Sequence, residues 1–553
     1  MPLRILFFSV TFLLVLSCAR QGSPSGGPKD EIPPRYLSST PDTLSLNVPI
    51  DLNEIKINFD EYIVLKEQQN NVIVSPPLGN TVNFQPIGTA SKTLRVKWNE
   101  SLRENTTYNI NFGNAIQDNN EGNVLAGFHF VFSTGDYIDS LMITGSLHLP
   151  SERELPKNLL VGLYPVDSAY NDSIVLRSKP FYVARPDEKG SFKLNYLHEG
   201  IYQMVAFNDE VQNLQFDPDK EKIGFIDEPV NLTTNQQINI SLFSQRPPYK
   251  AIKAEQKAYG HLVFKFSGQP EEVEVKPIDM DFTTSKISYV PRSDSLNFWF
   301  NPAIDSLGDK SSRIKFLVSH KDESDTISVV YSPGQAHKLR VDSKQKLGFA
   351  PDRNVRLTAN YPIGELDSAY VFVFKDSIRI QPKLIKHPVH DNDFTVDFPI
   401  ELNSSYSIEF YPNAITDFFG ETNDTLRYNF SVKSRNEYGH LKLSLGNPPK
   451  HPFIIRFLTE KGDLLDEQYT TRTEFDYNYL NPGNYYFQIF IDENENGFWD
   501  TGDFFSRKFP EPAFVSPELI NVRAMWDANE TWVLPLNNEN AVIEEEASTD
   551  ADK

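Results

Sequence analysis

Residues 55–59 read IKINF and residues 94–98 read LRVKW, so apolar and polar side chains alternate in both stretches. Residues 108–112 (YNINF) and 128–132 (FHFVF) are similar short stretches. Successive side chains of a β-strand point to opposite faces of its sheet, so this alternation predicts strands with one buried face. Asn, Asp, Gly and Pro separate the stretches, and no long segment has the 3.6-residue apolar period of a helix. The sequence predicts an all-β fold of tandem antiparallel β-sandwiches in series.

The composition is that of a folded protein and excludes several classes. At roughly 100–200 residues per domain, the 553 residues form about three to five domains, and 39% of them are hydrophobic. Gly (27) and Pro (38) are near average usage, which excludes a collagen-like chain. The net charge is −22 and no long basic block is present, so we expect no nucleic-acid partner. The single cysteine, Cys18, excludes a disulfide framework and a Cys-based zinc site within this chain.

The first residues predict export and a lipid anchor. Arg4 precedes twelve uncharged apolar residues, 5–16, and a membrane-spanning helix needs about 20, so residues 1–17 are predicted to be a signal peptide. Residues 15–18 (VLSC) resemble the bacterial lipobox, which implies cleavage before Cys18 and a covalent lipid on it. The alternative is an ordinary signal peptide with an incidental cysteine.

The residues after Cys18 bear on its destination. Ala19 stands where an Asp would imply retention in the inner membrane, so the resemblance implies the outer membrane of a Gram-negative bacterium. Residues 18–32 contain QGSPSGGPK, a composition that predicts a flexible tether. Residues 19–23 (ARQGS), directly after Cys18, lack the acidic cluster that marks surface export in related bacteria, which favours the periplasmic face over the cell surface.

Two internal repeats divide the chain. TTYNINFGNAIQDNNEGN (106–123) parallels SSYSIEFYPNAITDFFGETN (404–423), and FKLNYLHEGIYQMVAFND (192–209) aligns without gaps with FDYNYLNPGNYYFQIFID (475–492). Repeats of this kind indicate related structural units. The predicted boundaries are five β-modules followed by an acidic tail that we expect to be disordered: 33–136, 137–245, 250–340, 341–434, 435–536 and 537–553.

The first module resembles a known domain. Residues 55–61 (IKINFDE), 75–77 (SPP), 105–108 (NTTY) and 132–135 (FSTG) are similar to the SbsA-type bacterial Ig-like domain found in lipoproteins of the Bacteroidota. The resemblance covers 33–136, with a weaker copy at 341–434. Modules 137–245 and 435–536 resemble Cna-B or transthyretin-like sandwiches through a late Gly-x-Tyr strand and an acidic loop. The resemblance implies that these modules serve as spacers, stalks or binding scaffolds, and it implies no catalytic residues.

One loop carries a metal-binding pattern. Residues 492–503, DENENGFWDTGD, fit the twelve-residue calcium loop except that Asp stands at position 12 in place of Glu. Calcium prefers six to eight oxygen ligands. The predicted structural calcium ligands are Asp492, Asn494, Asn496, the carbonyl of Phe498, Asp500 and Asp503. The flanking sequences YYFQIF and FFSRKF both predict strands, so the loop would join two strands. The alternative is a hairpin turn at 496–497 with solvated carboxylates.

Other chemistry-bearing patterns are weaker. The repeat-related loop keeps Asp209, Asn213 and Asp217 but has Val211 and Leu214 where the calcium pattern has Asn and Gly, and we expect it to bind no metal. His387, His390 and Asp391 flank a proline, which favours a hairpin turn over a metal site. The tryptophans that we considered as sugar platforms, with burial in a sandwich core as the favoured alternative, are Trp98, Trp499, Trp526 and Trp532.

These observations favour a non-enzymatic, lipid-anchored protein of the outer membrane that serves as a scaffold or protein-interaction module. Its expected partners are the membrane, through the lipid anchor, and an unidentified envelope protein. A surface glycan-binding lipoprotein is the alternative, and it requires an aromatic platform flanked by amides or acids. A hydrolase with its site among the loops is a third possibility, although the chain has no G-x-S-x-G, H-E-x-x-H or P-loop motif.

Overall fold

The computed structural model describes residues 30–536 except residues 80, 169, 306, 308–310, 335–336 and 344–347. Strands make up 49% and helices 3%, so the predicted all-β fold is confirmed. The predicted signal peptide, Cys18, residues 18–29 of the predicted tether and the tail 537–553 lie outside the described residues. No helix in the described part of the chain is long and apolar enough to span a membrane.

The strands fall into five groups, sandwiches 1 to 5, and within the described residues no sheet combines strands from two groups. Sandwich 1 contains β1 (Tyr36–Thr40), β2 (Glu54–Leu65), helix α2 (Gln68–Asn71), β3 (Ile73–Ser75), β4 (Val82–Gln85), β5 (Ser91–Trp98), β6 (Thr107–Asn111), β7 (Ile116–Asp118) and β8 (His129–Ser133). Sandwich 2 contains β9 (Leu141–His148), β10 (Leu159–Pro165), η1 (Asp172–Leu176), β11 (Tyr182–Ala184), β12 (Ser191–Leu197), β13 (Gly200–Asn208), β14 (Lys222–Phe225), β15 (Val230–Leu232), β16 (Gln236–Gln237), β17 (Ile240–Ser241) and β18 (Phe243–Ser244).

The remaining three groups follow in chain order. Sandwich 3 contains β19 (Lys250–Ala258), β20 (His261–Ser267), β21 (Glu274–Pro277), β22 (Ser285–Tyr289), β23 (Ser295–Phe300), β24 (Ser312–His320) and β25 (Glu323–Tyr331). Sandwich 4 contains β26 (Val341–Ser343), β27 (Val355–Ala359), β28 (Ile363–Leu366), η2 (Ser368–Tyr370), β29 (Val371–Lys375), β30 (Ile378–Ile380), β31 (Lys383–Lys386), β32 (Asp393–Asp397), β33 (Ser404–Phe410), β34 (Ile415–Asp417) and β35 (Leu426–Val432). Sandwich 5 contains η3 (Arg435–Glu437), β36 (Gly439–Gly446), β37 (Phe453–Thr459), β38 (Leu464–Thr470), β39 (Glu474–Leu480), β40 (Gly483–Ile491), β41 (Ala513–Val515), β42 (Ile520–Val522) and β43 (Asp527–Val533).

Sandwiches 2 and 5 share the order of their central strands, and sandwich 2 adds β17 and β18. The strand order β11-β10-β13-β14 in sandwich 2 corresponds to β38-β37-β40-β41 in sandwich 5, and β12-β9-β16 corresponds to β39-β36-β43. In both, the last strand of the smaller sheet pairs in parallel, β16 with β9 and β43 with β36. The gapless sequence repeat therefore reflects a structural repeat, β12 with β13 in one copy and β39 with β40 in the other.

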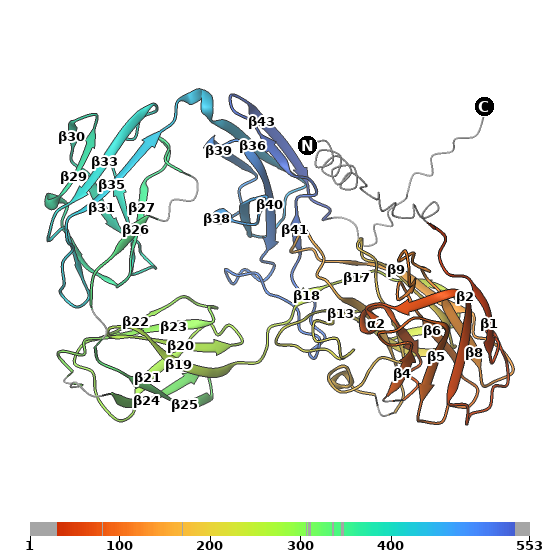
Figure 1. Cartoon of the computed structure of the whole chain (residues 1–553). Coiled ribbons are helices and arrows are strands. Elements are labelled where there is room, and N and C mark those ends of the chain that lie inside the picture. Colours follow the sequence, from red (N-terminus) through yellow and green to blue (C-terminus); the bar gives the residue numbers. More distant parts are fainter. Residues whose placement is uncertain are drawn as a thin grey trace, which may run out of the picture.

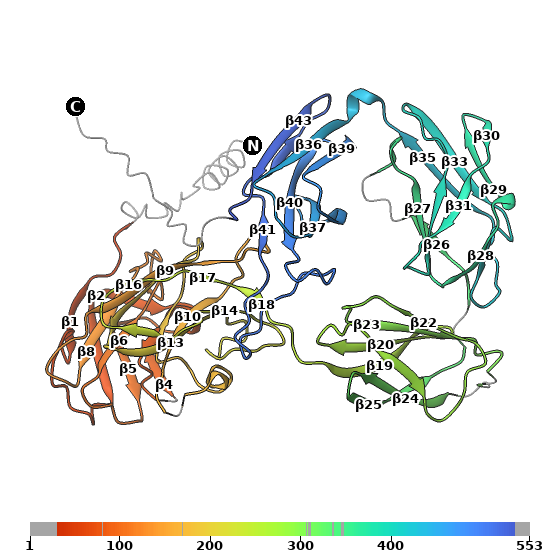
Figure 2. The ribbon, with the colours of Figure 1, turned by 180° about the vertical axis from the view of Figure 1, so that it is seen from behind.

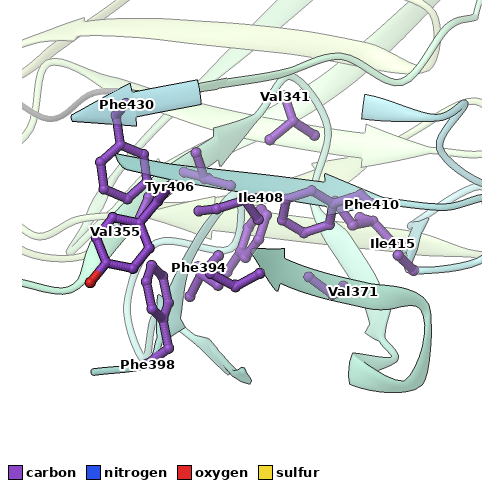
Figure 3. Packing of buried hydrophobic residues seen from close by; sticks show 14 of the residues in the cluster. Val341, Val355, Val371, Phe394, Phe398, Tyr406, Ile408, Phe410, Ile415 and Phe430 are labelled. Atoms are coloured by element: carbon purple, nitrogen blue, oxygen red, sulfur yellow. The ribbon is translucent and has the colours of Figure 1, made fainter. Parts of the chain in front are cut away.

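Each sandwich has its own apolar core between its sheets. In sandwich 4, every second residue of β33 (Tyr406, Ile408 and Phe410) is buried, and these side chains meet Phe394 and Phe430 from other strands (Figure 3). Full burial of one such side chain contributes about 1.5–3 kcal/mol, so the alternation seen in the sequence is what makes the core.

The sandwiches follow one another in an arc, and sandwich 5 returns beside sandwich 2 (Figures 1 and 2). Consecutive sandwiches share specific contacts. The backbone N–H of Val183 in sandwich 2 donates to the hydroxyl of Ser75 in sandwich 1 (3.1 Å). Lys286 of sandwich 3 pairs with Asp391 of sandwich 4 (2.6 Å). The guanidinium of Arg353 in sandwich 4 donates to the carbonyl of Asn478 in sandwich 5 (2.7 Å).

Candidate functional site at the junction of three sandwiches

The loop after β40 begins at a fully buried carboxylate. Asp492 has 0% exposure, and its two oxygens accept the backbone N–H groups of Asn496 (3.1 Å) and Gly497 (2.7 Å). The hydroxyl of Tyr469 donates to the same carboxylate (2.8 Å). Gly497 has a φ of +87°, which side chains disfavour, so this turn requires its glycine. Asp492 thus fixes the backbone of the predicted calcium loop.

A second carboxylate gathers the amides of the loop. The side-chain NH₂ groups of Asn494 and Asn496 each donate to Oδ2 of Asp500 (2.8 Å). The backbone N–H groups of Asn494 (3.2 Å) and Asp500 (2.8 Å) donate to the two carboxylate oxygens of Glu511, which is 9% exposed. Glu511 lies outside the twelve-residue motif, so sequence reasoning missed it.

Four of the six predicted calcium ligands therefore share one network: Asp492, Asn494, Asn496 and Asp500. The amide groups of the two asparagines would have to rotate to present oxygens beside Asp500. The N–H of Phe498 donates to Oδ1 of Asn496 (2.9 Å). Among the described residues, no group of three or more His, Cys, Asp or Glu is arranged to hold a metal ion. The calcium site stays a prediction, with a donor set that fits it in part.

Asp503 belongs to a separate turn. Its carboxylate accepts the N–H groups of Phe505 (2.9 Å) and Ser506 (3.4 Å), and its backbone exchanges two hydrogen bonds with Lys508. The prediction of a strand over FFSRKF is wrong, because residues 504–507 form this turn. Alternating aromatic and polar residues suggested a strand, whereas here the aromatic side chains are used for contacts with another sandwich.

Asp500 also connects sandwich 5 to sandwich 3. Its Oδ1 lies 2.9 Å from Nη1 of Arg292 in sandwich 3 and 3.6 Å from Nη2 of Arg246, in the segment between sandwiches 2 and 3. Arg292 also stacks on Phe498, with its guanidinium carbon 4.2 Å from the ring centroid. Burial alone would raise the pKa of Asp500, but the two asparagine amides and the charges of both arginines lower it below its usual range.

The turn at residues 503–508 docks on sandwich 2. Phe504 has 0% exposure in a cluster with Phe225 and Phe243 of sandwich 2, and its ring centroid lies 5.3 Å from that of Phe225. Arg507 forms a two-point ion pair with Asp172 of sandwich 2, in which Nε lies 2.8 Å from Oδ2. A Cβ on Gly502 would lie 2.7 Å from the ring of Phe243, so this approach needs a glycine. One loop thus joins sandwiches 2, 3 and 5.

The repeat-related loop of sandwich 2 has the same framework without these external contacts. Asp209 is 0% exposed and accepts the N–H groups of Asn213 (2.9 Å) and Leu214 (3.2 Å). Glu221 accepts the N–H of Asp217 (2.8 Å), as Glu511 does that of Asp500. Arg185, at the end of β11, lies 3.9 Å from Asp209 and faces it from within sandwich 2.

The other candidate residues from the sequence lie in different environments. His387 and His390 lie in the turn between β31 and β32, as predicted, with ring centroids 4.7 Å apart. Trp98 (2% exposed) and Trp532 (9%) are core residues, which confirms the interpretation favoured for them. Trp499 packs on Phe490 and donates its ring N–H to the carbonyl of Glu511 (2.8 Å). Trp526 differs, since 57% of it is exposed.

Comparison with known proteins supports part of the expected resemblance. Residues 30–134 match the family model of the bacterial Ig-like domain. None of the curated proteins compared with this chain matches it. The similar solved structures include the S-layer protein SbsC, with 11% identity, a TM-score of 0.13, and coverage of 84% of this chain and 64% of that one.

Two further similar structures come from Parabacteroides merdae and Bacteroides ovatus. A DUF3823 family protein from Parabacteroides merdae has 12% identity and a TM-score of 0.13, and the match covers 35% of this chain and 99% of that one. The glucan-utilization protein SGBP-B of Bacteroides ovatus, solved with a mixed-linkage heptasaccharide, has 8% identity and a TM-score of 0.20, with 69% and 94% coverage. These values carry no argument about function.

Proposed function

We propose that this chain is a non-enzymatic, multi-domain Ig-like scaffold of a Gram-negative cell envelope, anchored by lipid on Cys18 at the periplasmic face of the outer membrane. The observation that carries the proposal is the loop 492–511, which fixes sandwich 5 to sandwiches 2 and 3 through Asp500, Phe504 and Arg507. Contacts of this kind hold binding surfaces on separate sandwiches in fixed relative positions. Preorganisation lowers the entropic cost of binding a large partner.

The expected partner is an envelope protein, and exposed sheet edges offer it a mode of binding. β21 lies at one end of its three-stranded sheet, next to Ile278, which is 51% exposed, and β22 lies at one end of the facing sheet, with Ile287 44% exposed. A partner strand that adds to such an edge gains backbone hydrogen bonds and side-chain contacts together.

Calcium is a second part of the proposal. The buried carboxylate of Asp492 and the oxygens of Asn494, Asn496, Phe498 and Asp500 supply the hard ligands that calcium prefers. In this loop the ion would have a structural role, because the same residues already fix the turn from which the docking residues project.

Fractionation of cells that express the Cys18→Ala variant tests the anchor. We expect the wild-type chain in the detergent-soluble membrane fraction and the variant in the aqueous fraction, since the acyl chains supply the membrane affinity. Protease added to intact cells should spare the wild-type chain if it faces the periplasm. Equal membrane association of both chains would contradict the proposed anchor, and cross-linking in native membranes with mass spectrometry would identify the protein partner.

A further inference from the structure

A pocket of about 510 Å³ lies in sandwich 5, beside the segment that joins it to sandwich 4. Its aromatic wall consists of Trp526 and Tyr479, and Met525 borders them. Trp526 is 57% exposed and Met525 76% exposed. Large apolar side chains that stay exposed together beside a pocket are typical of binding surfaces.

The exposed pair is held in place by its backbone. The N–H of Met525 donates to the carbonyl of Tyr438 (2.9 Å), and the carbonyl of Trp526 accepts the N–H of His440 (2.9 Å). Met525 has a φ of +62°, a left-handed conformation that is uncommon for a non-glycine residue. The guanidinium of Arg523 lies 5.0 Å from the Trp526 ring centroid, which orients the ring. The platform is therefore preformed.

Polar groups line the rim of the same pocket. His440 lies 2.8 Å from the carboxylate of Asp476 and 3.4 Å from that of Asp527, whose side chain is 75% exposed. Asn436, also exposed, contributes an amide, and the guanidinium of Arg435 lies 5.2 Å from the Tyr479 ring centroid. The rim thus combines hydrogen-bond donors and acceptors, with acidic and basic groups both present, which suits a neutral, polyhydroxylated ligand.

The equivalent tyrosine of the structural repeat has different surroundings. Tyr196 of sandwich 2 occupies the position of Tyr479, and both have left-handed backbones, with φ of +59° and +50°. Tyr196 packs against His129 of sandwich 1, with ring centroids 6.3 Å apart. In sandwich 5 the corresponding place borders the pocket, which Trp526 and Asp527 line from β43 and the turn before it.

We propose that this pocket binds a neutral pyranose unit of a glycan. A pyranose ring presents an apolar C–H face, which stacks on Trp526, and hydroxyl groups at its edge, which reach Asp527, His440 and Asn436. The pocket lining combines the carboxylate of Asp527 with the guanidinium of Arg435, so no excess of one charge selects an ionic ligand. This binding site is independent of the scaffold function and of the lipid anchor.

The test uses the full mature chain with maltoheptaose, cellohexaose, xylohexaose and mannohexaose, and with polygalacturonate as an anionic probe. Isothermal titration and quenching of tryptophan fluorescence should detect at least one neutral oligosaccharide. Trp526→Ala should weaken that binding by about tenfold or more, because the stacking surface is lost, whereas Trp526→Phe should retain most of it.

Tyr62→Ala is the matched control, since Tyr62 is 56% exposed on sandwich 1, far from the pocket. It should leave binding unchanged. The proposal is overturned if no neutral oligosaccharide binds the wild-type chain, if only polygalacturonate binds, or if Trp526→Ala binds as tightly as the wild type. A loss of binding in Tyr62→Ala equal to that in Trp526→Ala would also overturn it.

Discussion

The loops at residues 209–221 and 492–511 follow equivalent strands of sandwiches 2 and 5, yet only the second joins other sandwiches. Both begin with a buried Asp and close with a buried Glu that accepts the N–H of an Asp (Asp217 or Asp500) at 2.8 Å. Four positions separate Asp217 from Glu221, but eleven separate Asp500 from Glu511. The seven extra residues contain the turn with Phe504 and Arg507, so the longer loop supplies the contact on a framework that both loops share.

The ion pairs of the two loops also differ, because only those of the longer loop cross to other parts of the chain. In sandwich 2, Asp217, the equivalent of Asp500, pairs with Lys220 of its own loop (3.4 Å). In sandwich 5, the cations near the loop carboxylate Asp500 come from elsewhere, Arg292 in sandwich 3 and Arg246 in the preceding segment. An ion pair within one sandwich stabilises that sandwich alone, whereas one that crosses between sandwiches fixes their relative positions.

Of the changes considered, Phe504→Ala should weaken the contact between sandwiches 5 and 2 most strongly. Truncation of a fully buried Phe costs about 3–5 kcal/mol, and here the loss falls on the contact between sandwiches 5 and 2. We expect a larger radius of gyration by small-angle X-ray scattering. The control is Phe192→Ala, which truncates a buried Phe in the separate core of sandwich 2 and should destabilise that sandwich without opening the chain. Unchanged scattering of Phe504→Ala would show that this side chain does not hold the two sandwiches together.

Asp500→Ala should have the next largest effect. It removes charge-assisted contacts with Arg246 and with Arg292, which keeps its ion pair with Glu271, at a cost of about 1.5–3 kcal/mol. Limited proteolysis should then cut more rapidly in the segment around Arg246. The same change at Asp217, the equivalent residue of sandwich 2, should leave that segment protected. Equal protection in both variants would mean that Asp500 does not fix sandwich 3.

Calcium should stabilise the chain through the loop at residues 492–511 and not through the loop at residues 209–221, with a smaller change in free energy than the two substitutions above. A ligand at ten times its Kd stabilises the folded state by about 1.4 kcal/mol, so calcium should raise the melting temperature of the full chain followed by tryptophan fluorescence. Sandwich 5 contains Trp499, Trp526 and Trp532, so this signal reports mainly on it. Asn494→Ala should abolish the increase, and Asn213→Ala in sandwich 2 should preserve it. The absence of any increase in the wild-type chain would remove calcium from the proposal.

Acid should also weaken the contact between sandwiches 5 and 3, but by less than Asp500→Ala does. The pKa of Asp500 is below its usual range in the folded chain, so its contribution is fully present above the unfolded value of about 3.9 and is lost as the pH falls through the lower folded value. We expect scattering to report opening below about pH 4. Asp500→Asn should show a flatter pH profile, and identical profiles would exclude this carboxylate as the titrating group.

Much of the fold was predictable from local patterns, but the site was predictable only in part. Alternation along residues such as Tyr406, Ile408 and Phe410 predicted buried strand faces, because burial of every second side chain is a local property of a strand. The calcium pattern located the loop and the roles of Asp492 and Gly497 in its turn. The pattern missed Glu511, which lies beyond its twelve residues. The alternation of FFSRKF wrongly predicted a strand at the turn of residues 503–508, since aromatic residues serve strand cores and contacts between sandwiches equally well.

The amino-acid order alone determined the all-β class, the repeat of sandwiches 2 and 5, and the position of the acidic loop, because strand alternation and turn residues act over a few neighbouring positions. Only the tertiary structure decided that Arg292, Asp172 and Phe243 meet residues 500–507, and that Trp526 stays exposed while Trp98 and Trp532 are buried. Contacts between residues hundreds of positions apart depend on how whole sandwiches pack, and no local pattern records that packing.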